Sequence, residues 1–568
     1  MDITTPYETT GGGAIVDALL ANNVDTVFGL PGAQMYPFFD ALAQTTDRIR
    51  TFGARHEQTC AYMAFGYARS TGRPGVFAVV PGPGVLNTTA ALCTAMGTCT
   101  PVLCVTGQVP TPFLDRGRGH LHELSDQLGT LDTLVKWTAR IERPQDAGDI
   151  VNEAFRQMMS GRPGPVAIEM AWDTMASSAL VQPARAADIA PPPDPLRDAI
   201  DRAAELVAAA RRPMIMVGSG AQHAADEVRT LAEALDAPVA AFRGGRGIVA
   251  EDHELGISSH TAYRLWPDTD VLIGIGTRLE LPYMRWTGMM QLIDRPAPPP
   301  HVVRIDIDPV EMRRLVPHAA IVADARAGTE ALCAAVVARR NADPAGRRQD
   351  RQRIATAKTS ARADIEKVQP QLAYLDVIRD VLPRDGIITI ELSQIGFTSY
   401  FGYPVQQPRT YISEGFQGTL GFGFPSALGV KVAHPDTPVV CLTGDGGFLF
   451  AAQELATAVQ EGIALVTLVF NNASFGNVLR DQQTRFNNRV IGARLENPDF
   501  LQFAAAFGVE AHRVASPEAL RPILAAALNA TGPVVIEVDT PGGSEANPWE
   551  FIIPGPGITY SRAINSAL

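Results

Sequence analysis

The chain has 568 residues, which is too long for a single hydrophobic core and predicts about three or four domains. Hydrophobic residues make up 46% of the chain and charged residues 19%, which is ordinary for a globular protein and excludes a largely disordered one. The net charge is −12 and no Lys/Arg-rich run occurs, so we expect no nucleic-acid partner.

The cysteines and the chain start favour a cytoplasmic enzyme. No CxxC pair occurs, and most cysteines lie in apolar runs, which is typical of buried, reduced thiols. The first thirty residues lack a basic segment followed by a long apolar one, and no apolar stretch approaches the ~20 residues that span a bilayer, so we expect no membrane partner. The six cysteines are Cys60, Cys93, Cys99, Cys104, Cys333 and Cys441.

Short apolar runs alternate with longer amphipathic stretches along the whole chain, which predicts an α/β fold. Continuous apolar strands separated by helices indicate parallel sheets that are covered on both faces. We therefore predict three consecutive, doubly wound parallel-sheet domains, and the first and third could be related folds. The predicted strands are Gly75–Val80, Val102–Thr106, Met214–Val217, Val271–Ile275, Val302–Ile307, Ile387–Ile390, Val439–Leu442 and Ala464–Phe470.

Two stretches are predicted to be linkers between these domains. Residues 183–195 are rich in Pro and Ala and lack apolar periodicity, and residues 341–360 are polar and charged. They divide the chain into three blocks, with domains predicted at residues 1–182, 196–340 and 361–568.

The most informative motif is Gly444-Asp445-Gly446, followed by 24 residues and then Asn471-Asn472. Asp445 follows one predicted strand and Asn472 ends the next, so both should lie at the carboxyl edge of a parallel sheet. Gly446 and Gly447 would let backbone N–H groups approach a diphosphate. A carboxylate, an amide oxygen and a backbone carbonyl suit Mg²⁺, whereas either half of the motif alone would indicate only a turn or a loop.

At this point the chain resembles, over nearly its whole length, the thiamine-diphosphate (ThDP) dependent enzymes of the acetolactate synthase and benzaldehyde lyase type. The resemblance implies that the first block binds the aminopyrimidine, that the middle block is a Rossmann-like spacer, and that the third block binds the diphosphate. It also implies that Asp445, Asn472 and the backbone oxygen of Ser474 hold the metal.

The second hallmark of this family is a glutamate, which matches Glu57 in Arg55-His56-Glu57-Gln58. The helical sequence AYMAFGYARSTGRPGV and then Pro81-Gly82-Pro83-Gly84 follow it. The resemblance implies that Glu57 shares a proton with N1′ of the aminopyrimidine, and a buried carboxyl with a raised pKa suits this role. Taken alone, Glu57 would be one of many acids near a helix start.

Further matches complete the expected cofactor site. Gly418 and Leu420, in the stretch 414–425, would offer backbone bonds to the pyrimidine, and Leu420 would be the apolar wedge between the two rings, although its ordinary interpretation is a core leucine. Ser393 and Gln394 match a diphosphate-contacting pair. The expected cofactor-binding residues are Pro31, Glu57, Ser393, Gln394, Gly418, Leu420, Gly444, Asp445, Gly446, Gly447, Asn472, Phe475, Gly476, Asn477 and Val478.

The substrate pocket departs from the family pattern. Acetolactate synthases carry Phe-Gln where this chain has Leu121-His122, and we expect His122 and Gln34 to act as catalytic residues beside Glu57. The RFDDR-like stretch that holds a keto acid carboxylate in those enzymes corresponds to residues 278–282, which lack its second arginine. Asp481 stands where plant and yeast synthases carry a tryptophan, and an acid there should disfavour anionic acceptors.

These departures favour a carboligase or lyase that acts on a 2-keto acid, acyloin or diketone rather than a housekeeping acetolactate synthase. A simple decarboxylase, a diketone hydrolase, a flavin-linked oxidase and a non-catalytic relative remain alternatives. Gly218-Ser219-Gly220 begins a nucleotide-binding turn without completing GxGxxG, so bound FAD or ADP stays open. The resemblance implies a homodimer or tetramer whose active sites are shared between subunits.

Overall fold

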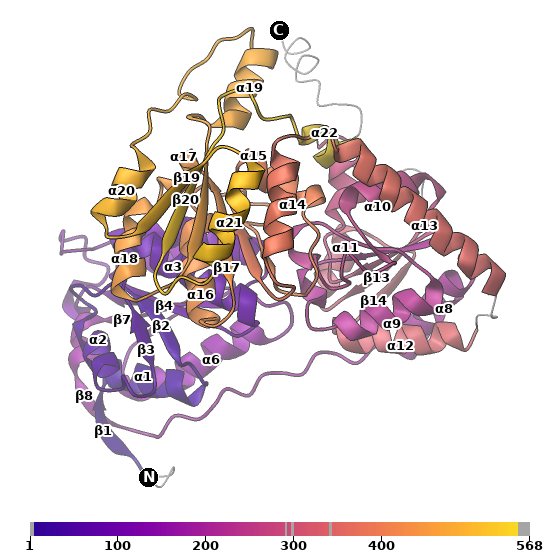
Figure 1. Ribbon diagram of the computed structural model, residues 1–568. Helices are drawn as coiled ribbons and strands as arrows, with labels where there is room; N and C mark the ends of the chain where they lie inside the picture. Colours follow the sequence, from indigo (N-terminus) through magenta and orange to yellow (C-terminus); the bar gives the residue numbers. More distant parts are fainter. Residues whose placement is uncertain (1–4, 290–291, 297–299, 340–343, 555–568) are drawn as a thin grey trace. The chain divides into compact units, whose positions relative to one another are not determined.

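The computed structural model describes residues 5–289, 292–296, 300–339 and 344–554 (Figure 1). It contains three six-stranded parallel sheets in succession, one in each predicted block, which confirms the predicted fold class. Within the described residues, no helix combines the length and the apolar character that crossing a membrane would need. All six cysteines lie within the described residues as free thiols, and three of them, Cys60, Cys104 and Cys441, are buried.

In the first block, a six-stranded parallel sheet and a two-stranded antiparallel pair, β1 with β8, are joined by short helices. The strands are β1 (Tyr7–Thr10), β2 (Thr26–Gly29), β3 (Arg50–Phe52), β4 (Gly75–Val79), β5 (Val102–Gln108), β6 (Thr138–Ile141), β7 (Val166–Ala171) and β8 (Ser178–Val181). The helices are α1 (Gly11–Ala21), α2 (Tyr36–Ala43), α3 (Glu57–Thr71), α4 (Pro83–Gly97), η1 (Thr111–Phe113), α5 (Gln127–Asp132), η2 (Pro144–Asp146), α6 (Ala147–Met159) and α7 (Trp172–Ala176).

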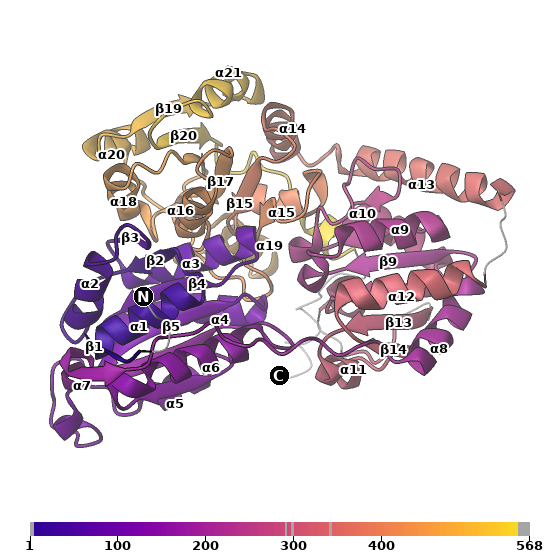
Figure 2. The same cartoon turned by 90° about the horizontal axis from the view of Figure 1, so that it is seen from below.

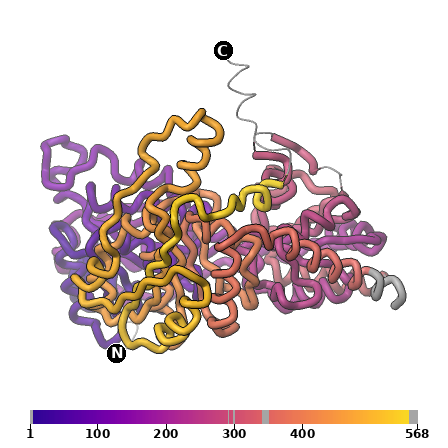
Figure 3. The backbone as a smooth tube through the Cα atoms, turned by 45° about the horizontal axis from the view of Figure 1, so that its top comes forward, coloured from indigo at the N-terminus to yellow at the C-terminus, as the bar shows by residue number. Residues whose placement is uncertain are grey.

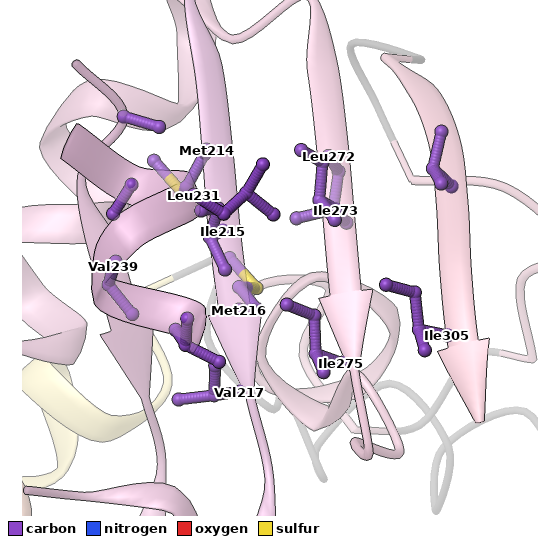
Figure 4. Close-up of a cluster of buried hydrophobic side chains, with 14 of the residues drawn as sticks. Met214, Ile215, Met216, Val217, Leu231, Val239, Leu272, Ile273, Ile275 and Ile305 are labelled. Carbon is purple, nitrogen blue, oxygen red and sulfur yellow. The ribbon is translucent and has the colours of Figure 1, made fainter. Parts of the chain in front are cut away.

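The middle block has its own sheet and hydrophobic core. Its strands are β9 (Pro213–Val217), β10 (Val239–Ala241), β11 (Gly256–Ile257), β12 (Val271–Ile275), β13 (His301–Asp306) and β14 (Ala319–Val322). Its helices are α8 (Arg197–Ala208), η3 (Ser219–Ala221), α9 (Ala225–Leu235), η4 (Arg243–Gly245), α10 (Ser259–Leu265), η5 (Trp266–Asp268), η6 (Leu281–Arg285), α11 (Pro309–Arg314), α12 (Ala325–Val337) and α13 (Pro344–Ile365). Figure 4 shows how side chains of β9, β12 and β13 fill this core beside Leu231 of α9.

The third block repeats the alternation of strand and helix. Its strands are β15 (Ile387–Ile390), β16 (Tyr411–Ile412), β17 (Val439–Gly444), β18 (Val466–Asn471), β19 (Glu510–Val514) and β20 (Val534–Asp539). Its helices are α14 (Gln371–Val381), α15 (Gln394–Gly402), α16 (Gly423–Ala433), α17 (Asp445–Phe448), η7 (Ala452–Glu454), α18 (Leu455–Gln460), α19 (Gly476–Arg485), α20 (Phe500–Ala506), α21 (Pro517–Ala527) and α22 (Trp549–Ile552). Helix α19 has no buried residue and projects beyond the sheet (Figures 1 and 3).

The strand orders distinguish the middle sheet from the other two. The first sheet runs β3-β2-β4-β5-β7-β6 and the third runs β16-β15-β17-β18-β20-β19, which is the same order once the strands are counted within each block. The middle sheet runs β11-β10-β9-β12-β13-β14, the order of dinucleotide-binding folds, with helices on its faces (Figure 2). The first and third blocks therefore share one topology.

By its contacts, the chain divides into two compact units. One unit comprises residues 1–191, 414–435 and 451–465, and the other comprises 192–413, 436–450 and 466–568. The first unit thus contains α16 and α18, although both belong to the third block in sequence. Residues 182–196 carry no helix or strand, as the first predicted linker requires.

The second predicted linker is largely wrong, because residues 344–365 form helix α13. The segment is highly charged in sequence, but one face of the helix is buried, and Ile354, Ala361 and Ile365 contribute to that face. The Lys358 Nζ donates to the carbonyl oxygens of Glu251, His253 and Gly256 at 3.0, 2.7 and 2.8 Å. Residues 341–343 lie outside the described residues. A few well-placed apolar side chains are enough to fix a helix that is otherwise polar.

Helices α3 and α16 pack at unusually close range within the first unit. A Cβ at Gly66 would overlap the carbonyl oxygen of Ser426, and a Cβ at Gly429 would overlap that of Met63. A glycine on each helix therefore lets the two backbones touch. Because Glu57 is the first residue of α3, this packing also fixes the start of that helix.

We expect Gly429→Ala to lower the free energy of unfolding by about 1–3 kcal/mol, because the added methyl group overpacks the contact with Met63. Gly148→Ala in α6 is a matched control, since a Cβ at Gly148 meets nothing within 4 Å. That change should raise stability by about 0.5–1 kcal/mol, because alanine favours a helix over glycine. Urea unfolding of both variants tests the pair, and equal shifts of the two midpoints would contradict the overpacking argument.

Candidate active site

The candidate residues of the third block lie at the topological switch point of its sheet. Strands β15 and β17 are neighbours, and the chain leaves them toward opposite edges, so their carboxyl ends border a crevice. Ser393 follows β15, and Gly444 ends β17. A Cβ at Gly444 would lie 3.1 Å from the Cβ of Ser393, so the two turns are adjacent.

The glycines after Asp445 are required by close packing. A Cβ at Gly446 would lie 2.5 Å from the ring of Phe475, and one at Gly447 would lie 2.7 Å from the Cγ of Glu391. Any larger residue would push the turn away from the crevice. The glycine pair therefore keeps the backbone N–H groups of this turn accessible to a ligand.

Ser474 contacts both Asp445 and Asn472, through its N–H and its Oγ. The backbone N–H of Ser474 lies within hydrogen-bonding reach of the Asp445 carboxylate, and both its N–H and its Oγ donate to Oδ1 of Asn472, at 3.1 and 2.9 Å. Asp445 is buried, and this burial raises the pKa of its carboxyl despite the hydrogen bonds that it accepts. A cation would offset this buried negative charge.

Two residues that the sequence did not reveal hold these groups in place. Asn497 donates through Nδ2 to Oδ2 of Asp445 at 2.7 Å and to Oδ1 of Asn471 at 2.9 Å. Glu545 accepts from Nδ2 of Asn472 at 2.5 Å, so that Oδ1 of Asn472 faces Ser474. Burial, together with the charge of Asp445, raises the pKa of Glu545 to about 7.

The remaining residues of this cluster surround two helix starts. Ser393 caps α15, its Oγ accepting from the N–H of Gly396 at 3.2 Å. Gln394 accepts from Arg480 at 3.2 Å, and a Cβ at Gly476, the first residue of α19, would lie 2.9 Å from Nδ2 of Asn472. The N-termini of α15 and α19 present free N–H groups, which favour an anion.

Asn477 and Val478, the last two of the expected cofactor-binding residues, differ in their surroundings. Asn477 accepts from Nε1 of Trp549 at 2.5 Å, which ties the start of α19 to α22. Val478 is 48% exposed.

This donor set fits a hard divalent cation and a diphosphate. Within the described residues, no group of three or more His, Cys, Asp or Glu side chains is arranged to hold a metal. The cluster instead combines one carboxylate with an amide oxygen, and Mg²⁺ takes such oxygen donors while keeping phosphate and water ligands.

In the first block, the candidate residues again follow the strands at a switch point. Strands β2 and β4 are neighbours, with Pro31 exposed after β2 and Pro81-Gly82 after β4. Glu57 begins α3, where its Oε2 accepts from Nδ2 of Asn87 at 3.0 Å. Asn87 belongs to the same motif as Gly84 but was not singled out from the sequence. Glu57 is half-buried, whereas the sequence led us to expect a buried carboxyl.

The buried acid Glu454 fixes the segment that leads into Glu57. Its two carboxylate oxygens accept from the backbone N–H of Arg55 at 3.1 and 3.0 Å, and its residue is 0% exposed. Both residues belong to the first compact unit, although Glu454 comes from η7 of the third block. An acid 399 positions away in sequence thus sets the backbone two residues before the candidate catalytic carboxylate.

Gly418 and Leu420 also lie in the first compact unit. Gly418 has a φ of 62°, which favours glycine, and Leu420 is half-buried. Between them, Thr419 shares a hydrogen bond of 3.1 Å with Thr94 of α4. The loop that carries both residues is therefore anchored on the same helix as Asn87.

Gln34 and His122 contact each other directly. The His122 Nδ1 lies 2.7 Å from Oε1 of Gln34, while Nε2 of Gln34 donates to the carbonyl oxygen of Leu121 at 2.8 Å. Gln34 is fully buried and Leu121 is 58% exposed. The Nδ1 of His120 lies 3.3 Å from the same carbonyl oxygen of Leu121, and its ring centroid lies 4.7 Å from that of Phe113.

The structure also clarifies the substrate residues expected from the third and middle blocks. Asp481 forms an ion pair of 3.7 Å with Arg485, which offsets part of its charge. Glu280 binds both Arg243, at 3.4 Å, and Arg285, at 2.6 Å. Arg285 is therefore paired with an acid of the same segment rather than free to meet a carboxylate.

Comparison with known proteins agrees with this organisation. The thiamine pyrophosphate enzyme models match in three parts: the N-terminal TPP binding domain over residues 9–130, the central domain over 200–332 and the C-terminal TPP binding domain over 393–538.

Similar proteins align over nearly their full lengths. A probable acetolactate synthase large subunit of Methanocaldococcus jannaschii is 33% identical, over 93% of this chain and 91% of its own. A probable 2-ketoarginine decarboxylase of Pseudomonas aeruginosa is 32% identical, over 94% of both chains. The acetolactate synthase isozyme 1 large subunit of Escherichia coli is 31% identical, over 97% of both. The chain therefore belongs to the family of thiamine diphosphate-dependent enzymes that includes the acetolactate synthases.

Proposed function

We propose that this chain is a ThDP- and Mg²⁺-dependent carboligase or lyase that forms or cleaves a carbon–carbon bond next to a carbonyl group. A 2-keto acid such as pyruvate would be decarboxylated, and the remaining acyl unit would add to a second carbonyl compound. The observation that carries this proposal is the Asp445–Asn472–Ser474 cluster at the switch point of the third sheet. The similarity to both acetolactate synthases and a 2-keto acid decarboxylase supports it.

Each part of the cofactor has residues that suit it. Asp445, Asn472 and the backbone of Ser474 would hold Mg²⁺, with Asn497 and Glu545 orienting the first two. The diphosphate would lie against the glycine turn and the starts of α15 and α19. The residues that would contact the cofactor in the third block are Ser393, Gln394, Gly444, Gly446, Gly447, Phe475, Gly476 and Asn477.

Glu57 would act on the aminopyrimidine, with Gly418, Leu420 and Pro31 around it. Bound ThDP supplies a carbon nucleophile and an electron sink. Glu57 would exchange a proton with the ring nitrogen that faces it, and Asn87 holds the carboxylate in one orientation through its 3.0 Å bond. The half-buried state of Glu57 in the single chain fits an active site that a second subunit completes, so we propose a homodimer or a larger homo-oligomer.

The residues expected around the substrate favour a function other than the housekeeping acetolactate synthase. His122 replaces a glutamine of those enzymes, and Glu280 neutralises the arginines that lie beside it. An anionic acceptor would therefore find little free positive charge at these positions. A decarboxylase that releases an aldehyde, or a hydrolase that cleaves a diketone, is the main alternative within the same chemistry.

The middle block is a poorer candidate for a flavin-binding domain than for a spacer domain. Its strand order is that of dinucleotide-binding folds, but the glycine turn packs tightly, so that a Cβ at Gly218 would overlap the carbonyl oxygen of Gly276. Gln222, in the position after that turn, donates to the carbonyl oxygen of Gly244 at 2.6 Å and accepts from the N–H of Arg409 at 3.0 Å. We propose no redox role for FAD, and a yellow protein that bleaches with substrate would contradict this view.

Incubating the purified protein with ThDP, Mg²⁺ and a panel of 2-keto acids, 2-hydroxy ketones and diketones tests the proposed function. We expect release of CO₂ from a keto acid and a coupled product when an aldehyde or ketone is added, both read by mass spectrometry. Free aldehyde without coupling would assign the decarboxylase alternative. No conversion of any compound in the panel would refute the proposal.

We expect Glu57→Gln to bind Mg²⁺ and ThDP nearly normally but to slow exchange of the C2 proton of ThDP by about 10²–10⁴-fold, the usual contribution of a positioned acid or base. Hydrogen–deuterium exchange at C2, followed by NMR, measures this rate. Glu142→Gln is a control, because Glu142 is an exposed acid of the same block. Normal exchange in the Glu57 variant would rule out the proposed role.

We expect Asn497→Ala to weaken Mg²⁺ binding by about 10–100-fold, as removal of a residue that orients a metal ligand typically does. The reason is that Asp445 loses its 2.7 Å hydrogen bond and can turn away from the cluster. Calorimetric titration with Mg²⁺ in the presence of ThDP measures the affinity. Asn529→Ala is the control, since Asn529 is exposed at the end of α21, and an unchanged affinity in the Asn497 variant would count against the metal site.

A further inference from the structure

Gln34 and His122 share an unusual backbone conformation. Their φ angles are 67° and 64°, in the left-handed region that residues other than glycine adopt uncommonly, although Asn, Asp and His do so more often than the rest. Such a conformation costs on the order of 1–3 kcal/mol and persists where the surrounding structure enforces it, often at functional sites. Two residues with such a conformation in direct contact require a physical explanation.

The backbones of both residues lie tightly against glycines that are themselves held in place. A Cβ at Gly107 would lie 2.5 Å from the carbonyl oxygen of Gln34, and one at Gly82 would overlap that of His122. The buried Gln127 binds both glycines, since Oε1 accepts from the N–H of Gly82 at 2.8 Å and Nε2 donates to the carbonyl oxygen of Gly107 at 3.1 Å. Nε2 of Gln127 also donates to Glu169 at 2.7 Å.

The hydrogen bonds of Gln34 determine which way its amide points. A carbonyl oxygen only accepts, so the NH₂ group of Gln34 must face the carbonyl of Leu121, at 2.8 Å. The amide oxygen Oε1 therefore faces His122 Nδ1, at 2.7 Å. Because Oε1 also only accepts, Nδ1 of His122 must carry a hydrogen.

We propose, on the basis of the function proposed above, that Gln34 is a positioning residue that holds neutral His122 as the Nδ1–H tautomer, so that Nε2 accepts the hydroxyl proton of a 2-hydroxy ketone. A neutral imidazole has one N–H, so a hydrogen on Nδ1 leaves the lone pair on Nε2. The preferred substrate class is then a ketone with a hydroxyl group on the neighbouring carbon.

Cleavage of such a compound moves one proton and two electron pairs. The O–H bond breaks and its proton goes to Nε2 of His122. The electron pair left on oxygen becomes the second carbon–oxygen bond of the released aldehyde or ketone. Bound ThDP would supply the electron sink for the pair of the broken carbon–carbon bond. Coupling is the reverse, with Nε2 returning the proton to the new hydroxyl oxygen.

The tautomer can be measured without cofactor or substrate. In protein labelled with ¹³C and ¹⁵N in histidine, the His122 signals are identified by their loss in His122→Asn. We expect the neutral ring to carry its hydrogen on Nδ1 in the wild type and in Gln34→Glu, which keeps an acceptor there, and on either nitrogen in Gln34→Met. A wild-type ring with its hydrogen on Nε2 would overturn the inference, and far-UV circular dichroism checks that the variants fold.

The substrate class is tested with acetoin and pyruvate as probes, in the presence of ThDP and Mg²⁺. We expect the ratio of acetoin cleavage to pyruvate decarboxylation to fall by about 100-fold in His122→Asn. It should also fall in Gln34→Met and recover in part in Gln34→Glu, whereas His512→Asn, at a histidine of β19 that pairs with Glu510, should keep the wild-type ratio. An unchanged ratio in His122→Asn would refute the proton transfer. A wild-type enzyme inactive on both probes would refute the inferred substrate class, whereas inactivity on the whole panel above would refute the proposed function. The NMR result would decide the tautomer in either case.

Discussion

The buried carboxylate of Asp445 is the group on which the candidate site depends. A carboxylate without a nearby counter-charge is costly to bury, and the structure offsets this cost only in part, through Asn497 and the surrounding N–H groups. The glycines that follow leave no side chain to fill the crevice. Strands β17 and β18 are neighbours, so the carboxylate that follows β17 lies at the same sheet edge as the amide that follows β18.

The first and third blocks place their candidate residues at the same position relative to the sheet. Each has the same strand order, and in each the chain reverses direction across the sheet between two neighbouring strands. The candidate residues that follow these strands, Gln34 in one block and Asp445 in the other, lie at the point where open α/β sheets bind ligands. The middle block has a different order, and its glycine turn is closed by packing against Gly276.

The sequence predicted the sheets and the motif residues because both leave local signals. Apolar runs marked the strands to within a few residues, and the glycines and polar residues after them marked the turns. Helix α13 was missed because its buried residues are sparse among charged ones. Asn497 and Glu545 were missed for a different reason: each is an ordinary polar residue whose partner is distant in sequence, so only the fold gives it a role.

The close contact between α3 and α16 has a consequence for how the family could evolve. Helix α16 belongs to the third block in sequence but is built against the first, with its backbone fitted to a glycine of α3. A recombination event that exchanged the third block between relatives would bring a foreign helix to this contact, and any side chain in place of Gly429 would obstruct it. The two cofactor-binding blocks are therefore expected to be inherited together, while the middle block is freer to diverge.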